Sequence, residues 1–164
     1  MDTISTKSLL LTLVLMLLIS AFFSAAETAM MSLNRYKLRH LAKSKHKGAM
    51  RVEKLLQRPD RLLGLILIGN NLVNILASSI ATLLAIRAFG DYGIAVATTI
   101  ITFAILIFSE VTPKTLAALN PERIAYPAAI ILRLLMVPFY PLVWLINFLA
   151  NGLLELFGIK LRKK

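Results

Sequence analysis

Polar side chains interrupt three apolar runs of the sequence at helical spacing. Ser20 and Ser24 are four residues apart in the first run, and Asn70 and Asn74 are four apart in the second. Glu110 lies at the end of the third run. Residues four apart lie on one face of a helix. Hydroxyl, amide and carboxylate oxygens without His or Cys form a hard ligand set, which suits Mg²⁺, Ca²⁺ or Na⁺ and argues against zinc, copper or iron.

These side chains reach a common depth if the three runs are straight helices across a membrane. A rise of about 1.5 Å per residue places Ser24 roughly 16 Å from the basic boundary at Arg35. The same rise places Asn70 roughly 14 Å from the boundary at Arg61, and Glu110 roughly 28 Å below the opposite surface. Three helices would thereby bring oxygens to one level, a little inside the midplane, which favours an ion site.

The third run is expected to be irregular near its carboxylate. A charged glutamate within a span costs at least about 2.5 kcal/mol, so Glu110 should face a partner or water rather than lipid. Pro113 follows it closely and has no backbone N–H. We expect Pro113 to displace the helix and leave carbonyl oxygens free to face a cavity.

Each polar residue also has a structural interpretation. The serines suit close helix packing or bonds to their own backbone, and the asparagines suit hydrogen bonds between helices. Asn71 points about 100° away from Asn70, as a structural bond or a dimer contact. Glu27 either joins the serine face or extends towards the basic loop that follows. Lys114 either neutralises Glu110 or marks the inner boundary of the third run.

The composition indicates an integral membrane protein. Of 164 residues, 58% are hydrophobic and only 16% charged, against about a quarter charged in soluble domains. Cysteine is absent, which excludes disulfides and thiolate metal sites. The net charge of +11 comes mostly from residues beside the apolar runs, without the aromatic interleaving used to stack bases, so no nucleic-acid partner is expected. We predict no enzyme, because no nucleophile–base pair or His-rich site is present.

Three spans are predicted, over about residues 8–31, 62–86 and 94–112. The first is too long for the apolar region of a cleaved signal peptide and is read as a retained span. Lys and Arg gather between the first two runs, and cytoplasmic loops carry such an excess. The amino terminus is therefore expected outside and the carboxyl terminus inside, which suits the basic tail of Lys160, Arg162, Lys163 and Lys164.

Two further segments are expected on the cytoplasmic side. Residues 36–58 have the pattern of one amphipathic helix on the inner membrane surface. Residues 121–158 are apolar, but Arg133 interrupts them and Pro138 and Pro141 break them. We favour two shorter helices against the bundle or in the inner interface over a fourth span. The whole chain, 1–164, is taken as a single transmembrane domain without an internal repeat, so a symmetric pathway would need two copies.

Three motifs in this order resemble the transmembrane domain of the cyclin M / CorC family. They are LISAFFSAAETAMMSLNR in the first span, IGNNLVNI in the second and FSEVTPKT at the end of the third. Each motif alone is moderately specific, whereas the ordered set is strong. The resemblance covers nearly the whole chain.

The resemblance implies a magnesium transporter of the plasma (inner) membrane, generally regarded as an exporter, for which coupling to Na⁺ has been proposed. It implies a homodimer with three spans per protomer and a belt of juxtamembrane helices. Cytoplasmic CBS-type domains, expected in a full-length form, lie outside this sequence. The family's dehydrated Mg²⁺ site maps onto the polar residues above, and Pro113 shapes the helix. The matching ligand positions are Ser20, Ser24, Asn70, Asn74 and Glu110. Transport by alternating access is the leading hypothesis, and a Mg²⁺ sensor or dimeric scaffold that does not transport is the alternative.

Overall fold

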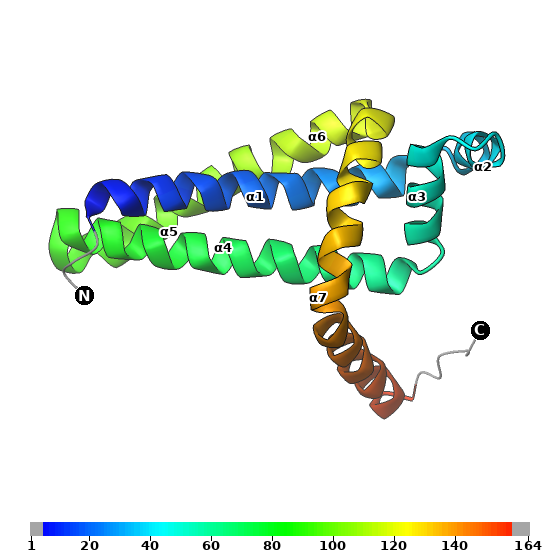
Figure 1. Cartoon of the computed structure of the whole chain (residues 1–164). Helices are drawn as coiled ribbons and strands as arrows, with labels where there is room; N and C mark the ends of the chain where they lie inside the picture. Colours follow the sequence, from blue (N-terminus) through cyan, green and yellow to red (C-terminus); the bar gives the residue numbers. More distant parts are fainter. Residues whose placement is uncertain (1–4, 159–164) are drawn as a thin grey trace. The chain divides into compact units, whose positions relative to one another are not determined.

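The all-helical class predicted from the sequence is confirmed. A computed structural model describes residues 5–158, and every regular element in that range is helical (Figure 1). The basic tail discussed above lies outside the described residues. The elements are α1 (Thr6–Ser32), α2 (Arg35–Lys43), α3 (Lys47–Leu56), α4 (Pro59–Phe89), η1 (Gly90–Tyr92), α5 (Gly93–Ala104), η2 (Ile105–Val111), α6 (Thr112–Leu119) and α7 (Pro121–Leu156).

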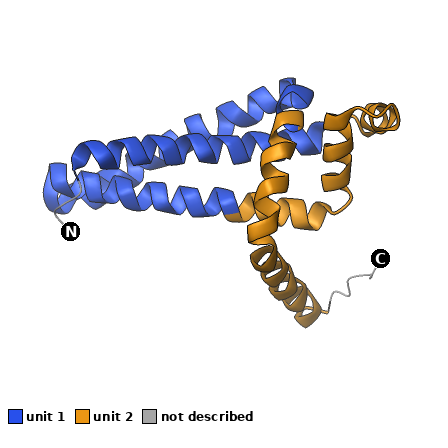
Figure 2. Cartoon of the chain, in the orientation of Figure 1, with its two compact units in different colours: residues 1–33, 69–125 blue, residues 34–68, 126–164 orange. Residues whose placement is uncertain are grey.

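The chain divides into two compact units (Figure 2). Unit 1 comprises residues 1–33 and 69–125 and holds α1, most of α4 and the helices from η1 to α6. Unit 2 comprises residues 34–68 and 126–164 and holds α2, α3, the first turns of α4 and most of α7. All the polar residues proposed as ion ligands belong to unit 1.

Among residues 5–158, three helical segments are long and apolar enough to cross a membrane: Thr6–Ser32, Pro59–Leu119 and Pro121–Leu156. The first corresponds to the predicted span at 8–31. The second reverses direction at η1 and therefore contains both other predicted spans, 62–86 in α4 and 94–112 in the helical run from α5 to α6. These lengths support a membrane location, while the sides on which the termini lie stay a prediction.

The reversal between α4 and α5 depends on two glycines. Gly90 has φ +67°, a conformation that other residues rarely adopt. Gly93 packs on the backbone of α4, where an added Cβ would lie 2.6 Å from the carbonyl carbon of Ala85 and from the nitrogen of Ile86. The tight turn lets α5 run back beside α4 (Figure 1). Side chains of α1, α4 and α5 line one apolar pocket there, so the three helices pack together.

The basic segment differs from its prediction as one helix over 36–58. The structure has two helices, α2 and α3, separated at Ser44–His46. Lys45 has φ +64°, a left-handed conformation that cannot continue a helix. The Ser44 hydroxyl donates to the carbonyl of His40 at 3.1 Å, and the His46 imidazole accepts the N–H of Ala49 at 3.1 Å as a new amino-terminal cap. Local capping thus ends one helix and starts another within a single amphipathic pattern.

The prediction of two short helices over 121–158 is wrong. The structure has one continuous helix, α7, which includes Pro127, Pro138 and Pro141. Packing on both sides of the last two prolines accounts for this: Leu132 and Val143 are fully buried within unit 2. Proline in a long apolar helix is tolerated when neighbouring groups compensate for the lost backbone bonds.

Substitution of Gly93 by Ala is expected to destabilise the chain by about 1–3 kcal/mol, because the new methyl group must displace the backbone of α4. Gly152→Ala is the matched control, since nothing lies within 4 Å of the position in α7. That change should be neutral or stabilise by up to about 1 kcal/mol. Unfolding in mixed micelles measures both, and equal stability of the two variants would contradict this account of the turn.

Candidate cation site

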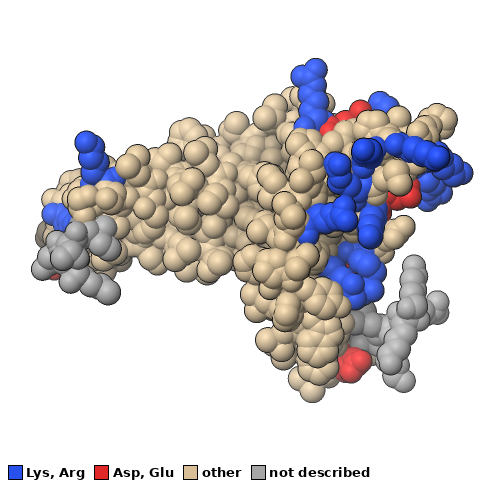
Figure 3. All heavy atoms as spheres, in the orientation of Figure 1, with Lys and Arg blue, Asp and Glu red and all other residues tan. Residues whose placement is uncertain are grey.

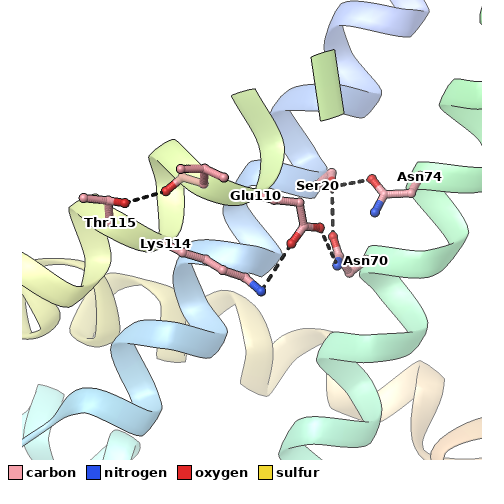
Figure 4. A network of polar contacts seen from close by, with 7 residues as sticks. Ser20, Asn70, Asn74, Glu110, Lys114 and Thr115 are labelled. Carbon is pink, nitrogen blue, oxygen red and sulfur yellow. Dashed lines mark hydrogen bonds and ion pairs between the residues drawn. The ribbon is translucent and has the colours of Figure 1, made fainter. Parts of the chain in front are cut away.

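The Ser20 hydroxyl of α1 is the centre of a polar network inside unit 1 (Figure 4). Its Oγ lies 2.8 Å from Oδ1 of Asn70 and 2.5 Å from Oδ1 of Asn74, both on α4. Ser20 is fully buried and Asn70 is 8% exposed. The helical spacing of the asparagines therefore places two amide oxygens around one hydroxyl, as the sequence pattern predicted.

This network has more acceptors than protons. A serine hydroxyl carries one hydrogen and can satisfy only one of two carbonyl oxygens at a time. The Nδ2 group of Asn70 lies 3.4 Å from Oε1 of Glu110, which fixes the orientation of that amide with its oxygen towards Ser20. Oxygens that converge without enough hydrogens repel one another in an apolar bundle. A bound cation would relieve that repulsion.

The Glu110 carboxylate, which comes from η2, completes one side of the network. Its Oε2 lies 3.2 Å from the ammonium Nζ of Lys114, one helical turn further on. Of the two roles predicted for Lys114, the structure shows that it pairs with Glu110. The Glu110 side chain is 23% exposed and that of Lys114 41% exposed, so the pair borders the network rather than lying within it. The carboxylate is thus positioned between the Asn70 amide and a lysine that balances its charge.

A π-helix positions Glu110. The seven residues of η2 run up to Val111, and the N–H of Thr112 donates to the carbonyl of Ile107, five residues earlier. Pro113 has no N–H for the carbonyl of Ser109, four residues earlier, which explains why the regular pattern is interrupted here. The irregularity expected near Pro113 is therefore present. A wider turn rotates the following side chains and is frequent at functional sites.

Ser109 is a residue that the sequence analysis missed as part of the site. It is fully buried, and its hydroxyl donates to the backbone carbonyl of Leu17 on α1 at 2.9 Å. This bond connects η2 to α1 one turn away from Ser20. Its position next to Glu110 in the FSEVTPKT motif was the available signal, but a lone serine in a span is usually a packing residue.

Ser24 is fully buried, and no hydrogen-bond partner for its hydroxyl is found among residues 5–158. It lies one turn from Ser20 on the same face of α1, about 6 Å along the helix. A buried hydroxyl without a partner costs about 1–3 kcal/mol. The amino-terminal half of α4 approaches this part of α1 closely, because Gly69 leaves room for the ring of Phe23. The Ser24 hydroxyl is therefore placed to act as a further oxygen ligand beside Ser20.

The other polar residues of the spans are separate from the network. Glu27 is half-buried, and no hydrogen bond or ion pair is found for it among residues 5–158. Asn71 is exposed and lines a groove with Asn74 and Ser78, which agrees with its predicted divergence from Asn70. No group of three His, Cys, Asp or Glu side chains gathers within the described range. A cation held there would therefore take most of its ligands from hydroxyl and amide oxygens.

Comparison with known proteins gives consistent matches over nearly the whole chain. A family model described as the cyclin M transmembrane N-terminal domain matches residues 10–164. The UPF0053 inner membrane protein YfjD of Escherichia coli is 56% identical over 142 residues, which cover 87% of this chain and 33% of that protein. A UPF0053 protein of Haemophilus influenzae is 48% identical over 161 residues, or 98% of this chain and 38% of that protein. The chain therefore spans little more than a third of these relatives.

A more distant relative has a functional name. The polyamine export protein of Haemophilus influenzae is 31% identical over 163 residues, which cover 92% of this chain and 38% of that protein.

Two serines allow a matched test of the site in the absence of metal. Ser24→Ala removes a hydroxyl without a partner and should leave stability unchanged or raise it by about 1 kcal/mol. Ser109→Ala removes the bond to Leu17 and should lower stability by about 0.5–1.5 kcal/mol. Unfolding in micelles with a metal chelator measures both. A loss in Ser24→Ala as large as that in Ser109→Ala would show that Ser24 already has a structural partner.

Proposed function

The chain belongs to the family of cyclin M transmembrane N-terminal domains, and on this premise we propose that it carries Mg²⁺ across the plasma (inner) membrane, in the outward direction. The observation that supports this cargo is the convergence of two amide oxygens on the single proton of Ser20, beside a carboxylate. Such membrane families are of the transporter type, and the proposal assigns no enzymatic activity.

The proposed ligands are the oxygens of the network. Ser20, Asn70 and Asn74 already lie within hydrogen-bond distance of one another, so small movements would bring their oxygens to a common ion. Ser24 would supply its free hydroxyl, and Glu110 the one full negative charge. Mg²⁺ gives up its water reluctantly and prefers six oxygens at about 2.0–2.1 Å. A dehydrated ion therefore needs the carboxylate most, and Glu110 should dominate affinity.

Lys114 would act as the counter-ion of the empty site. Its ammonium group holds the Glu110 carboxylate at 3.2 Å, and a Mg²⁺ ion at that carboxylate would repel it. Binding would then exchange one cation for another, which keeps the carboxylate neutralised in both states. Because Lys114 is 41% exposed, it can swing away without displacing the bundle.

Movement of the ion is proposed to follow alternating access in a homodimer. One chain offers few helices for a pathway, so a second copy would complete it. The half-buried Glu27 is a candidate for a second ion position on α1, and Na⁺ is the candidate coupling ion. A sodium gradient opposed to the Mg²⁺ gradient would accelerate flux if this coupling exists.

Two other functions are to be tested beside Mg²⁺ export. A relative that is 31% identical is called a polyamine export protein, which makes a polyamine the second candidate cargo. A long polycation needs several anionic groups along its length, whereas this network has one carboxylate at its edge, which favours Mg²⁺. The third candidate is a Mg²⁺ sensor or dimeric scaffold, which would bind the ion without moving it.

Flux into proteoliposomes of purified full chain separates these candidates. We expect Mg²⁺ to cross with the wild-type chain, and Glu110→Gln to lower both binding and flux at least about tenfold, because it removes the one charged ligand. Asn70→Leu should also weaken Mg²⁺ binding without unfolding the bundle. Asn71→Leu is the matched control, since that neighbouring side chain faces away from the network.

Each alternative has its own outcome in this assay. Transport of spermidine but not Mg²⁺ would assign the chain to polyamines. Mg²⁺ binding without flux would support the sensor or scaffold. Undiminished Mg²⁺ transport by Glu110→Gln would overturn the assignment of the site itself.

Lys114→Gln should change Mg²⁺ affinity in the direction opposite to Glu110→Gln. Removal of the competing ammonium group should tighten Mg²⁺ binding by about threefold to tenfold at low salt, and the gain should shrink as salt screens the pair. Titration of Mg²⁺ by calorimetry at two salt concentrations measures this effect. Weaker binding in Lys114→Gln would mean that Lys114 supports the occupied site instead of competing with the ion.

A further inference from the structure

Unit 2 contains a pocket of about 580 Å³ between α3, the first turns of α4 and α7. It has no part in the proposed ion site, which lies in unit 1. Its walls combine two kinds of side chain. The cationic ones are Arg51, Lys54, Arg58, Arg61 and Arg133, and the apolar surface comes from Leu55, Met136, Val137 and the ring of Tyr140.

Most of this positive charge has no carboxylate partner within the described part of the chain. Arg58 pairs with Asp60, with Nε 3.3 Å from Oδ1, and this hydrogen bond and the charge of Asp60 raise the pKa of the guanidinium. For Arg51, Lys54 and Arg133, no carboxylate partner is found among residues 5–158. Several cations around one concavity repel each other unless an anion lies between them. The pocket is therefore suited to an anionic ligand.

The aromatic wall fixes one of the cations in place. The guanidinium of Arg61 lies over the ring of Tyr140, 4.9 Å from its centroid. Such stacking orders the arginine while its N–H groups remain available to an anion. Arginine with a planar fork of donors is the residue most suited to phosphate. Tyr140 and Arg61 thus join the charged and apolar halves of one site.

We infer that this pocket binds an anionic phospholipid, with the headgroup phosphate among the arginines and an acyl chain along Met136 and Val137. A small soluble anion would use the charges but leave the apolar wall in water, whereas a phospholipid satisfies both. Lys and Arg gather over the elements of unit 2, as Figure 3 shows, which is where a membrane chain meets anionic headgroups. Basic pockets between helices are known to hold such headgroups.

The chain contains a suitable probe beside this pocket. Trp144 is its single tryptophan, one helical turn after Tyr140 on α7. It stacks on Phe148 with centroids 5.4 Å apart, and together with Arg61 and Tyr140 it lines a smaller adjoining pocket. A lipid with bromine atoms on its acyl chains quenches tryptophan fluorescence on close approach. Trp144 is 57% exposed and therefore reports the lipids that lie against α7, at the pocket and in the surrounding bilayer. Comparison of matched variants isolates the contribution of the pocket.

The test compares brominated phosphatidylglycerol with brominated phosphatidylcholine at equal mole fraction in vesicles that hold the full chain. We expect stronger quenching by the anionic lipid. Arg51→Gln combined with Arg133→Gln, one residue from each side of the pocket, should lower this preference at least about tenfold. Lys43→Gln combined with Lys47→Gln removes the same charge from exposed positions outside the pocket and should keep most of the preference. Circular dichroism checks that both double variants fold.

Three results would overturn the inference. Equal quenching by the two lipids in the wild-type chain would show no anionic site near Trp144. An equal loss in both double variants would show that the basic surface attracts anionic lipid without a built pocket. Removal of the preference by millimolar glycerol phosphate would show that the pocket recognises a soluble phosphate. Retention of the preference in its presence would support the phospholipid.

Discussion

The rest of unit 1 depends on one constraint. The oxygens buried around Ser20 outnumber the hydrogens that they can share. Water can supply missing hydrogen bonds at a protein surface, but an apolar helical bundle offers no such compensation. Two amide oxygens meet one hydroxyl there, and a second hydroxyl one turn away has no partner. Such an arrangement costs stability unless something positive joins it. The Mg²⁺ proposal rests on this convergence of oxygens where α1 meets α4.

The backbone around the network is built to hold it in place. Gly69 lets α4 accept the ring of Phe23 from α1, and Gly93 lets α5 turn back tightly on α4. The π-helix ahead of Pro113 then directs Ser109 to α1 and Glu110 to Asn70. The two glycines allow close helix packing, whereas the π-helix is a true departure from regular helix. The site gives that departure a purpose that apolar packing alone would not require.

Much of this arrangement could be predicted from spacing alone. Residues four apart on straight helices, counted from basic boundaries, are enough to bring Ser20 and the asparagines together and to turn Asn71 away. The all-helical class followed from apolar run length. Spacing cannot show that Ser24 lacks a partner or that Lys114 pairs with Glu110, because both depend on side-chain contacts.

The two errors both concern where a helix ends. Proline was expected to break the last helix, but buried residues on both sides keep α7 continuous, so tertiary packing outweighed local propensity. The basic segment was expected to stay continuous, but capping by His46 after a left-handed Lys45 divided it. Periodicity carries information on which face of a helix is apolar, and it does not report where a helix ends. The basic pocket likewise forms only where α3 and α7 lie side by side, which periodicity does not report.

The most direct measurement of the central claim is a high-resolution structure of the full chain with Mn²⁺ in place of Mg²⁺, since Mn²⁺ accepts the same octahedral set of oxygens and scatters anomalously. The account predicts one anomalous peak at about 2.0–2.6 Å from the oxygens of Ser20, Asn70, Asn74 and Glu110. It also predicts that the Lys114 ammonium leaves the Glu110 carboxylate. A peak elsewhere, with the Ser20 oxygen still at hydrogen-bond distance from both amide oxygens, would contradict it.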